Sequence, residues 1–297
     1  MEAKLKNIFS MIVFGTIAIF VKNITLSTGE IALYRAIIAS FAIIVYMIVL
    51  KKKIKFSEIK KDIPFLFISG AAMGFNWIFL FEAYNYTTVS IATLSYYFAP
   101  VIVMIISPIL FKEKMTIKQI VCFIMATLGL IMVIGIGSMN KSINNVLGIG
   151  FGIGAAVLYA TVILLNKFIK NVTGIDRTLI QFIAATIILI PYVLNTTGIN
   201  IGSLDVSGLL NLLILGLFHT GVTYCLYFSS IKDLKGQEAA ILSYIDPLVA
   251  IIISVTLLRE SISIIQILGG AMILGFTILN EVKLRPDKSC ITESNNL

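Results

Sequence analysis

The sequence predicts an all-α integral membrane protein whose ten transmembrane helices form two inverted five-helix repeats. Three observations support this prediction: an apolar composition, ten apolar segments of membrane-spanning length, and an internal repeat. Hydrophobic residues make up 58% of the 297 residues and charged residues 13%, with a mean hydropathy of +1.00. Soluble domains carry about 25% charged residues. The chain therefore has too little polar surface for water, and we expect it in the cell membrane.

The ten apolar segments follow one another along the chain, separated by short polar stretches. Each has close to the roughly 20 residues that a helix needs to cross about 30 Å of hydrocarbon. A backbone in lipid must satisfy its hydrogen bonds internally, so helices are expected despite the many Ile and Val residues. The first segment is expected to be a retained helix and not a signal peptide, because nine more spans follow it. The predicted spans lie near 8–26, 30–50, 63–86, 88–111, 116–138, 146–169, 175–195, 207–231, 235–258 and 262–281.

The distribution of basic residues between the loops predicts the orientation of the chain. If the N-terminus is cytoplasmic, 19 of the 23 Lys and Arg residues fall on the cytoplasmic side. Lys22, Lys141 and Arg259 fall outside, and Arg35 alone lies within a span. Cytoplasmic loops of membrane proteins carry an excess of Lys and Arg. Both termini are therefore expected in the cytoplasm, and the net charge of +8 does not indicate a nucleic-acid partner.

The internal repeat appears when the chain is shifted by 147 residues. This shift aligns 81–120 with 228–267 without a gap, and 12 of the 40 positions are identical. Apolar composition does not readily produce matched Pro, Glu and Gln residues at fixed spacing. Glu113 and Glu260 are expected to fasten equivalent loops at opposite ends of the bundle. The matched pairs include Tyr97 with Tyr244, Pro100 with Pro247, Ser107 with Ser254, Glu113 with Glu260 and Gln119 with Gln266.

The repeat divides the chain into two units of five helices. Because five is odd, the second unit enters the membrane from the opposite side, so the repeats are inverted. The predicted units are 1–140 (helices 1–5), 141–285 (helices 6–10) and a polar cytoplasmic tail at 286–297.

Two matched prolines point to a site between the halves. Inverted repeats are a ground plan of secondary transporters, which hold substrate near the midplane where helices are broken. Pro100 and Pro247 each lie at the centre of a predicted span. A proline there frees the carbonyl group four residues earlier, which belongs to Tyr96 or Ser243. We interpret the pair as helix breaks beside a binding site; packing kinks are the alternative.

Polar and aromatic residues at helical spacing define candidate cavity faces. Asn76 and Thr223 occupy equivalent repeat positions and are expected to face each other across the pseudo-twofold axis. The alternative for such polar stripes is hydrogen bonding between helices, which is common in membranes. The predicted substrate-binding residues are Phe14, Asn76, Trp77, Tyr96, Tyr159, His219, Thr223, Ser243 and Asp246.

Asp246 is the strongest of these candidates. An aspartate at the centre of a span costs roughly 2.5–3.5 kcal/mol on insertion scales and usually faces a cavity. It can also cap the half-helix that begins at Pro247, and the two roles are compatible. His219 is assigned equally to the cavity or to a bond with a neighbouring helix. Arg35 is expected to be structural, paired with Glu30.

The sequence predicts no cofactor and no metal. One histidine and three scattered cysteines give no metal-ligand spacing. The glycine-rich run at 148–155 lies inside an apolar span with no strand before it, so it does not predict a dinucleotide loop. Gly150 and Gly154 form a small-xxx-small pair that is expected to pack closely. No P-loop is present, so ATP-driven transport would need another subunit.

Together these residues resemble the drug/metabolite transporter superfamily, and specifically its EamA-like branch. The signatures "SYYFAP…FKE" and "SYIDP…LRE" carry the resemblance, and "FGTIAIFVK" and "LYRAIIA", with Gly15 and Arg35, add to it over about residues 8–281. Two positions depart from the pattern: Ala99 stands opposite Asp246, and Phe14 replaces a frequent tryptophan. The resemblance implies an exporter or exchanger of small metabolites, amino acids among them. It also implies a central cavity lined by helices 1, 3, 4, 6, 8 and 9.

The expected function is secondary transport of amino acids, amines or related compounds by alternating access. Aromatic residues suit a cationic ligand, and Asp246 adds a preference for an amine. The expected surroundings are a lipid bilayer, with a proton as candidate coupling ion and a monomer or homodimer as the assembly. An intramembrane enzyme acting on a lipid or isoprenoid, with Asp246 and His219 as acid and base, is the alternative; a scaffold is a third. No second well-placed carboxylate or Asp-rich motif accompanies them, so we expect no enzyme.

Overall fold

The computed structural model describes residues 2–51, 59–111, 116–134, 143–169, 172, 174–231, 242–243 and 245–281. These residues form helices and connecting turns without a β-strand, which confirms the predicted all-α fold class. The helices in chain order are α1 (Glu2–Gly15), α2 (Ile17–Lys22), α3 (Thr28–Val49), α5 (Ile63–Tyr86), α6 (Val89–Tyr96), α7 (Ala99–Phe111), α8 (Ile117–Ile134), α9 (Ile143–Phe168), α10 (Gly174–Thr196), the 3₁₀ turn η1 (Ile201–Ser203), α11 (Val206–Leu213), the π-helical η2 (Ile214–Val222), α12 (Thr223–Ile231), α14 (Ile245–Thr256) and α15 (Ile264–Glu281).

The helices carry an apolar outer surface that belongs in lipid. Large apolar side chains face outward, with Ile48 69% and Phe41 64% exposed. A soluble monomer rarely exposes apolar surface on this scale. Within the described residues, six helical segments are long and apolar enough to cross a membrane, and four shorter apolar ones accompany them. The six lie at Glu2–Lys22, Thr28–Val49, Ile63–Tyr86, Asn144–Asn166, Gly174–Thr196 and Val206–Tyr227, and the four at Val89–Val103, Ile120–Met132, Ile245–Thr256 and Ile264–Leu279.

Three of the ten predicted spans are interrupted. The first leaves regular helix after Gly15 and resumes at Ile17. The fourth breaks at Tyr97 and Phe98, between α6 and α7. The eighth contains η2 between α11 and α12. Of the ninth predicted span (235–258), the part before α14 lies almost entirely outside the described residues.

Several helices begin where the sequence supplies a capping side chain. Ser27 forms a capping box with Glu30 at the start of α3: the Glu30 N–H donates to Ser27 Oγ at 3.2 Å, and the Ser27 N–H donates to Glu30 Oε2 at 3.4 Å. Thr88 accepts from the Ile91 N–H before α6 at 3.3 Å, and Asp205 caps α11. A cap of this kind stabilises a helix by about 1 kcal/mol. Local sequence therefore sets where these helices start.

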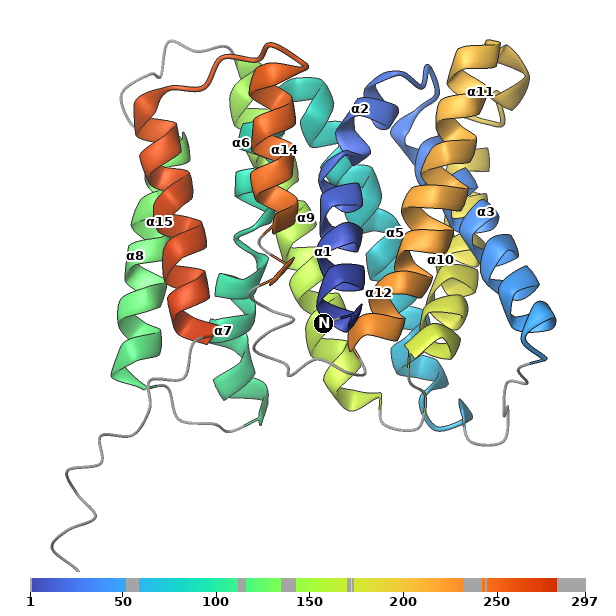
Figure 1. Ribbon diagram of the computed structural model, residues 1–297, viewed down its shortest axis with the longest axis horizontal. Coiled ribbons are helices and arrows are strands. Elements are labelled where there is room, and N and C mark those ends of the chain that lie inside the picture. The colour runs from blue at the N-terminus through green and yellow to red at the C-terminus, as the bar shows by residue number, and fades with distance from the viewer. Residues whose placement is uncertain are drawn as a thin grey trace, which may run out of the picture.

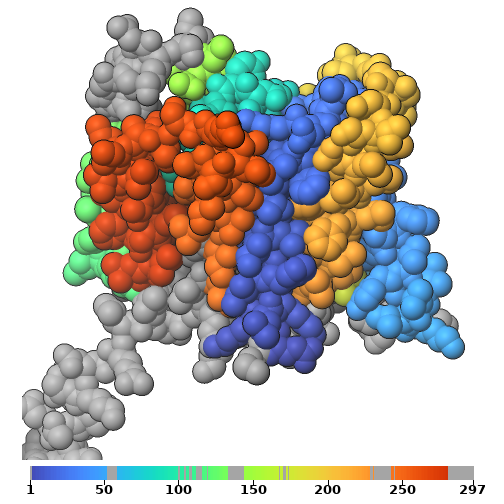
Figure 2. Space-filling view, turned by 45° about the horizontal axis from the view of Figure 1, so that its top comes forward, coloured from blue at the N-terminus to red at the C-terminus, as the bar shows by residue number. Residues whose placement is uncertain are grey.

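Helices from the two halves of the sequence pack against each other. α5 lies along α9 and α10, and α3 packs against η2 and α10. α1 lies between α12 and α14, as the blue helix between the golden and orange ones in Figures 1 and 2. α8 and α15 pair at one edge of the bundle (Figure 1). The main apolar core therefore draws on both halves of the chain.

Close approach of α9 to its neighbours depends on glycine. A Cβ at Gly148 would lie 2.7 Å from the Thr87 side chain, and a Cβ at Gly152 would lie 2.8 Å from that of Ser95. Real Cβ atoms do not approach other atoms so closely, so a larger residue would push the helices apart. A Cβ at Gly150 would meet nothing within 4 Å. The close packing predicted for Gly150 and Gly154 is therefore wrong at Gly150. It is confirmed at Gly154, where a Cβ would lie 2.6 Å from the Phe79 ring.

Candidate functional site

A central cavity of about 410 Å³ lies between the helices of the two halves. Its walls come from α1, α5, α6, α9, α12 and α14, and also from α3 and α10. Pockets for small ligands usually measure about 300–1,000 Å³. The cavity is therefore large enough for a small metabolite.

Seven of the nine predicted binding residues border this cavity, and two do not. His219 and Thr223, both in the described part of the chain, lie outside the lining. The seven that border it are Phe14, Asn76, Trp77, Tyr96, Tyr159, Ser243 and Asp246.

The π-helical η2 explains why His219 and Thr223 turn away. We assigned their faces with the 3.6 residues per turn of an α-helix, whereas i→i+5 bonding widens each turn. His219 Nδ1 lies 3.3 Å from the Ile214 carbonyl oxygen, five residues earlier, and Nε2 lies 2.8 Å from Thr16 Oγ1. The ring also packs against Phe20, with centroids 4.5 Å apart. His219 thus links η2 to the junction of α1 and α2.

Thr223 and Asn76 do not face each other as predicted. The Thr223 hydroxyl donates to the Phe218 carbonyl within its own helix at 2.7 Å. The Asn76 amide donates to the Ala155 carbonyl at 2.7 Å, and so joins α5 to α9. The repeat alignment did not reveal this difference, because the chain around Asn76 is α-helical whereas η2, just before Thr223, is π-helical.

Asp246 lies in the first turn of α14 and meets a residue from the break in the other half. Its Oδ2 accepts a hydrogen bond from the Tyr97 hydroxyl at 2.6 Å. The same hydroxyl lies 3.5 Å from the Ser243 carbonyl oxygen, one of the two groups that the prolines were expected to free. Helix N-termini favour negative charge. The break between α6 and α7 therefore holds the start of α14.

Both matched prolines stand in the first turn of a half-helix. Pro100 is the second residue of α7, and Pro247 is the third residue of α14. Proline suits a first turn because an N–H there has no intrahelical partner. The interruption between α6 and α7 accordingly precedes Pro100.

α1 approaches the first turn of α14 at Gly15. A Cβ at this position would lie 2.7 Å from the Asp246 carbonyl oxygen and 2.6 Å from Val249 Cβ. Only a residue without a side chain fits between the two backbones. The backbone of α1 thus sets the position of Asp246 in the cavity.

Arg35 is a cavity residue that the sequence analysis assigned to structure. The predicted pair with Glu30 is wrong: Glu30 accepts from the Asn200 N–H at 2.6 Å and caps α3. Arg35 Nε donates to Thr220 Oγ1 at 2.6 Å, and its guanidinium carbon lies 4.5 Å from the Trp77 ring centroid. An ionisable residue inside a span is a functional candidate by default, and that signal was available in the sequence. Tyr97 was likewise marked by its repeat match with Tyr244.

Aromatic rings form much of the cavity wall. The Tyr96 and Tyr159 centroids lie 5.4 Å apart, and Phe14 lies 5.0 Å from Tyr224 and 6.0 Å from Tyr227. Rings at about 4.5–7 Å attract one another in tilted and edge-on arrangements. The wall is therefore cohesive, and it offers aromatic faces to an apolar or cationic group.

The cavity is also lined by polar residues near the end of α9 and the start of α10, at the end of the bundle where the chain begins (Figure 1). Asn166, Arg177 and Gln181 border it there. The Gln181 amide donates to Asn166 Oδ1 at 2.8 Å and to Ser69 Oγ at 2.7 Å, and Arg177 donates to backbone carbonyls just before α10. The cavity wall is therefore polar on the side that faces this end of the bundle.

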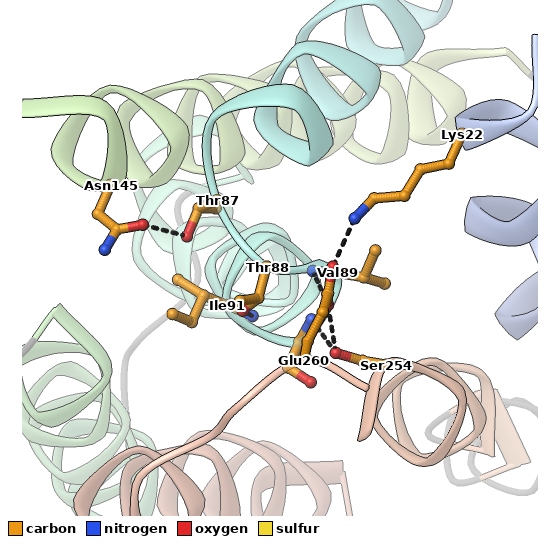
Figure 3. Close-up of polar contacts among 9 residues, drawn as sticks. Lys22, Thr87, Thr88, Val89, Ile91, Asn145, Ser254 and Glu260 are labelled. Carbon is orange, nitrogen blue, oxygen red and sulfur yellow. Dashed lines mark hydrogen bonds and ion pairs between the residues drawn. The ribbon is translucent and has the colours of Figure 1, made fainter. Parts of the chain in front are cut away.

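At the opposite end, Glu260 joins three helices (Figure 3). Its Oε1 accepts from Lys22 Nζ at 2.5 Å, at the end of α2. Its Oε2 accepts from the Val89 N–H at 2.7 Å, at the start of α6, and from the Ser254 hydroxyl of α14 at 2.5 Å. The Glu260 side chain is only 13% exposed. Glu260 was expected to hold its own loop in place. It also connects α2 and α6 of the first half to α14 of the second half.

The remaining predictions concern metals and enzyme chemistry. The described ranges contain no group of three or more His, Cys, Asp and Glu side chains that could hold a metal ion. The acid–base pair of the enzyme alternative is not brought together in the cavity, because Asp246 borders it and His219 does not.

The chain resembles proteins that are named as transporters. The model of the EamA-like transporter family matches residues 5–135 and 146–281. The chain is 28% identical to the uncharacterized transporter YxxF of Bacillus subtilis (strain 168), over 98% of this chain and 92% of that protein. It is 26% identical to an uncharacterized transporter of Archaeoglobus fulgidus, over 92% of this chain and 93% of that protein. A crystal structure of a protein with 15% identity covers 93% of this chain and 97% of its own at a TM-score of 0.64, which shows likeness of fold alone.

Proposed function

Because the chain belongs to the EamA-like transporter family, we propose that this multi-pass membrane protein is a secondary transporter that exports or exchanges amino acids, amines or related small metabolites. The observation that carries the proposal is Asp246, a carboxylate that borders the cavity from the first turn of a half-helix. Such a residue costs roughly 2.5–3.5 kcal/mol to insert. A cationic substrate group or a proton would be its functional partner.

Reconstitution in liposomes tests the proposal. The purified protein should accumulate radiolabelled amino acids or amines, and mass spectrometry of the lumen should find them chemically unchanged. Conversion of the solute would favour an enzyme instead.

Asp246→Asn separates a substrate role from a capping role. Asparagine keeps the size and much of the capping ability of aspartate but removes the charge. Transport should fall at least about tenfold, since a hydrogen bond to a charged group contributes about 1.5–3 kcal/mol. Size-exclusion profile and melting temperature should stay near those of the parent. Near-normal transport by this variant would leave Asp246 a structural cap.

The same proposal includes ten spans in two inverted repeats, 1–140 and 141–285, followed by a polar tail at 286–297. The two separate family matches, at 5–135 and 146–281, support this division. The half-helices α7 and α14 also support it, because each has its matched proline in the first turn.

The transport cycle is proposed to be alternating access. In support, Asn166, Arg177 and Gln181 line the cavity toward one end of the bundle, while Glu260 ties helices together at the other. The conformation described here would then be the one open toward the N-terminal end. The break between α6 and α7 and the first turn of α14, which contain or adjoin Pro100 and Pro247, would act as hinges when the halves rock. Both prolines are therefore assigned to the moving parts.

Both termini are proposed to lie in the cytoplasm, which would make the open end cytoplasmic. The support is the excess of basic residues on that side, 19 of 23. A thiol reagent that cannot cross membranes should label Lys141→Cys in intact cells. It should label Lys55→Cys only after permeabilisation; both positions lie outside the described residues. Labelling of position 55 in intact cells would reverse the orientation.

The proposed binding wall combines the charge of Asp246 with aromatic and polar neighbours. The assembly is proposed to be a monomer or homodimer in the bilayer, with a proton as candidate coupling ion at Asp246. The residues assigned to the wall are Phe14, Asn76, Trp77, Tyr96, Tyr159 and Ser243.

A further inference from the structure

Arg35 is a buried cation that borders the cavity from α3. The residue is 3% exposed and lies seven positions after the start of a helix of 22 residues. A charge in a protein interior is retained when it is paired or fully hydrogen-bonded. Glu30, on the same helix, is occupied by Ser27 and Asn200. The compensation for the Arg35 charge must therefore come from elsewhere.

The hydrogen bonds of Arg35 use one of its five N–H donors. Nε donates to Thr220 Oγ1, and among the described residues Arg35 makes no other hydrogen bond and no ion pair. The guanidinium packs against Trp77 and Phe81, at 4.5 Å and 5.8 Å from their ring centroids. These contacts hold the guanidinium in place beside the cavity, which Arg35 borders. A guanidinium held in this way binds a carboxylate with two parallel hydrogen bonds.

Besides Arg177, which bonds to backbone carbonyls beside its own helix, the cavity is bordered by a cation, Arg35, and an anion, Asp246, that do not meet. Arg35 reaches it from α3 and Asp246 from α14, and these helices lie on opposite sides of α1 in Figure 1. The two side chains form no ion pair; Asp246 is bonded to Tyr97 and Arg35 to Thr220. Tyrosine side chains of α5, α6 and α12 line the space that both charges border.

We infer that the cavity binds an elongated zwitterion, with a carboxylate on Arg35 and an ammonium group on Asp246. This inference rests on the proposed transport function and narrows its substrate class. α14 packs against α1 and α6, whereas α3 packs against η2, α10 and α5, so the two charges come from helices that are not neighbours in the bundle. An α-amino group and an α-carboxylate, in contrast, share one carbon atom. The substrate instead carries its two charges at opposite ends, as an ω-amino acid does. Aromatic walls between the charges suit the apolar chain that joins them.

A series of ω-amino acids measures the separation directly. The probes are glycine, β-alanine, γ-aminobutyrate, δ-aminovalerate and ε-aminocaproate, each titrated against purified protein by thermal shift and competition. Affinity should rise with chain length to a maximum beyond β-alanine. The methyl ester of the tightest probe, which lacks the negative charge, should bind about tenfold more weakly or worse. Its N-acetyl derivative, which lacks the positive charge, should be weakened to a similar degree.

Variants assign each end of the probe to a residue. Arg35→Gln should abolish the preference for acid over ester and keep the preference for amine over N-acetyl amine. Asp246→Asn should do the reverse. Thr220→Val is the matched control, because it removes the partner of Nε but keeps the charge; it should retain the preference for acid over ester. Arg35→Lys should retain part of it.

The outcomes separate this inference from the proposed function. Tightest binding of glycine, equal binding of acid and ester by the parent protein, or binding of none of the probes would overturn the inference. Since the parent comparison of acid with ester needs no variant, it decides the question even if Arg35→Gln does not fold. Transport of simple amines in liposomes would still support the proposed function in each case, whereas a parent protein that moves no amine or amino acid at all would count against that function itself.

Discussion

At one end of the bundle a single carboxylate, Glu260, receives hydrogen bonds from α2, α6 and α14. Toward the other end, polar residues of α9 and α10 line the cavity. The first end is closed by residues that lie far apart in the sequence. At the second end, Arg177 bonds to carbonyls near its own helix. The repeat counterpart of Glu260 is Glu113, which lies outside the described residues.

The difference teaches how a closed end can also open. Parting the contacts of Glu260 releases polar groups that water can solvate. Separating packed apolar helices would instead expose apolar surface to water, which costs about 25 cal/mol of free energy per Å². The polar contacts at this end are the ion pair and two hydrogen bonds of Glu260 and the bond from the Ser90 N–H to Ser254 Oγ. Bonds to water can replace all of them, so separating these contacts costs little free energy. If Glu113 forms the matching closure in the opposite state, the two ends exchange roles during transport.

The largest expected effect comes from preventing the closed end from opening. The Ser90 N–H lies 3.3 Å from Ser254 Oγ, so α6 and α14 are near enough for a disulfide between cysteines at these positions. In a background without Cys122, Cys225 and Cys290, oxidation of Ser90→Cys/Ser254→Cys should reduce transport to background, and a thiol reductant should restore it.

The two single-cysteine variants, treated in the same way, are the controls. Mass spectrometry should establish that the disulfide has formed. Full transport by the cross-linked protein would mean that this end stays closed throughout the cycle.

A smaller effect, in opposite directions, is expected from the two repeat-related glutamates. Glu260→Gln loses the ion pair with Lys22, so the closed end should open more often. An Ala250→Cys probe in the cavity should then react about tenfold faster with an impermeant thiol reagent added outside, since hydrogen bonds to charged groups contribute about 1.5–3 kcal/mol. Glu113→Gln should slow the same reaction. If both variants changed the labelling rate in the same direction, Glu260 and Glu113 would not close opposite ends of the bundle in alternate states.

The smallest effect is expected at Lys22. Its side chain is 30% exposed, and exposed ion pairs contribute about 0.2–1 kcal/mol. Lys22→Gln should therefore change the same labelling rate by about two- to fivefold, and about 1 M salt should remove most of the difference. Lys6→Gln is a matched control, because Lys6 pairs with Glu2 at 2.6 Å at the other end. An equal effect of the two variants would mean that general charge, and not the Glu260 contact, controls access.

Much of the fold could be predicted because lipid imposes simple rules. Apolar segments of membrane length had to be helices, because a backbone in lipid must satisfy its hydrogen bonds internally. The position of Asp246 beside the cavity followed from the expense of a charge within a span. The aromatic neighbours Tyr96 and Tyr159 followed from helical periodicity.

The rest depended on contacts that no local pattern contains. The wider turn of η2 moves His219 off the face that an α-helical count assigns to it. Arg35 finds its hydrogen-bond partner in Thr220, 185 positions away, and could not be placed by looking one turn along its own helix. Tyr97 reaches Asp246 only because a helix break in one half lies beside a helix start in the other.

The absence of a Cβ at Gly15 sets how closely α1 and α14 can approach each other. A methyl group there would act as a wedge 2.7 Å from the Asp246 carbonyl oxygen, and would tilt α14 and its carboxylate away from α1. A genetic selection for altered solute preference could therefore recover substitutions at Gly15. They would have the same effect on transport as substitutions of Asp246, although the carboxylate itself would be unchanged. The evolution of substrate specificity in such a protein would depend on the distance between two helix backbones as much as on the side chains that contact the substrate.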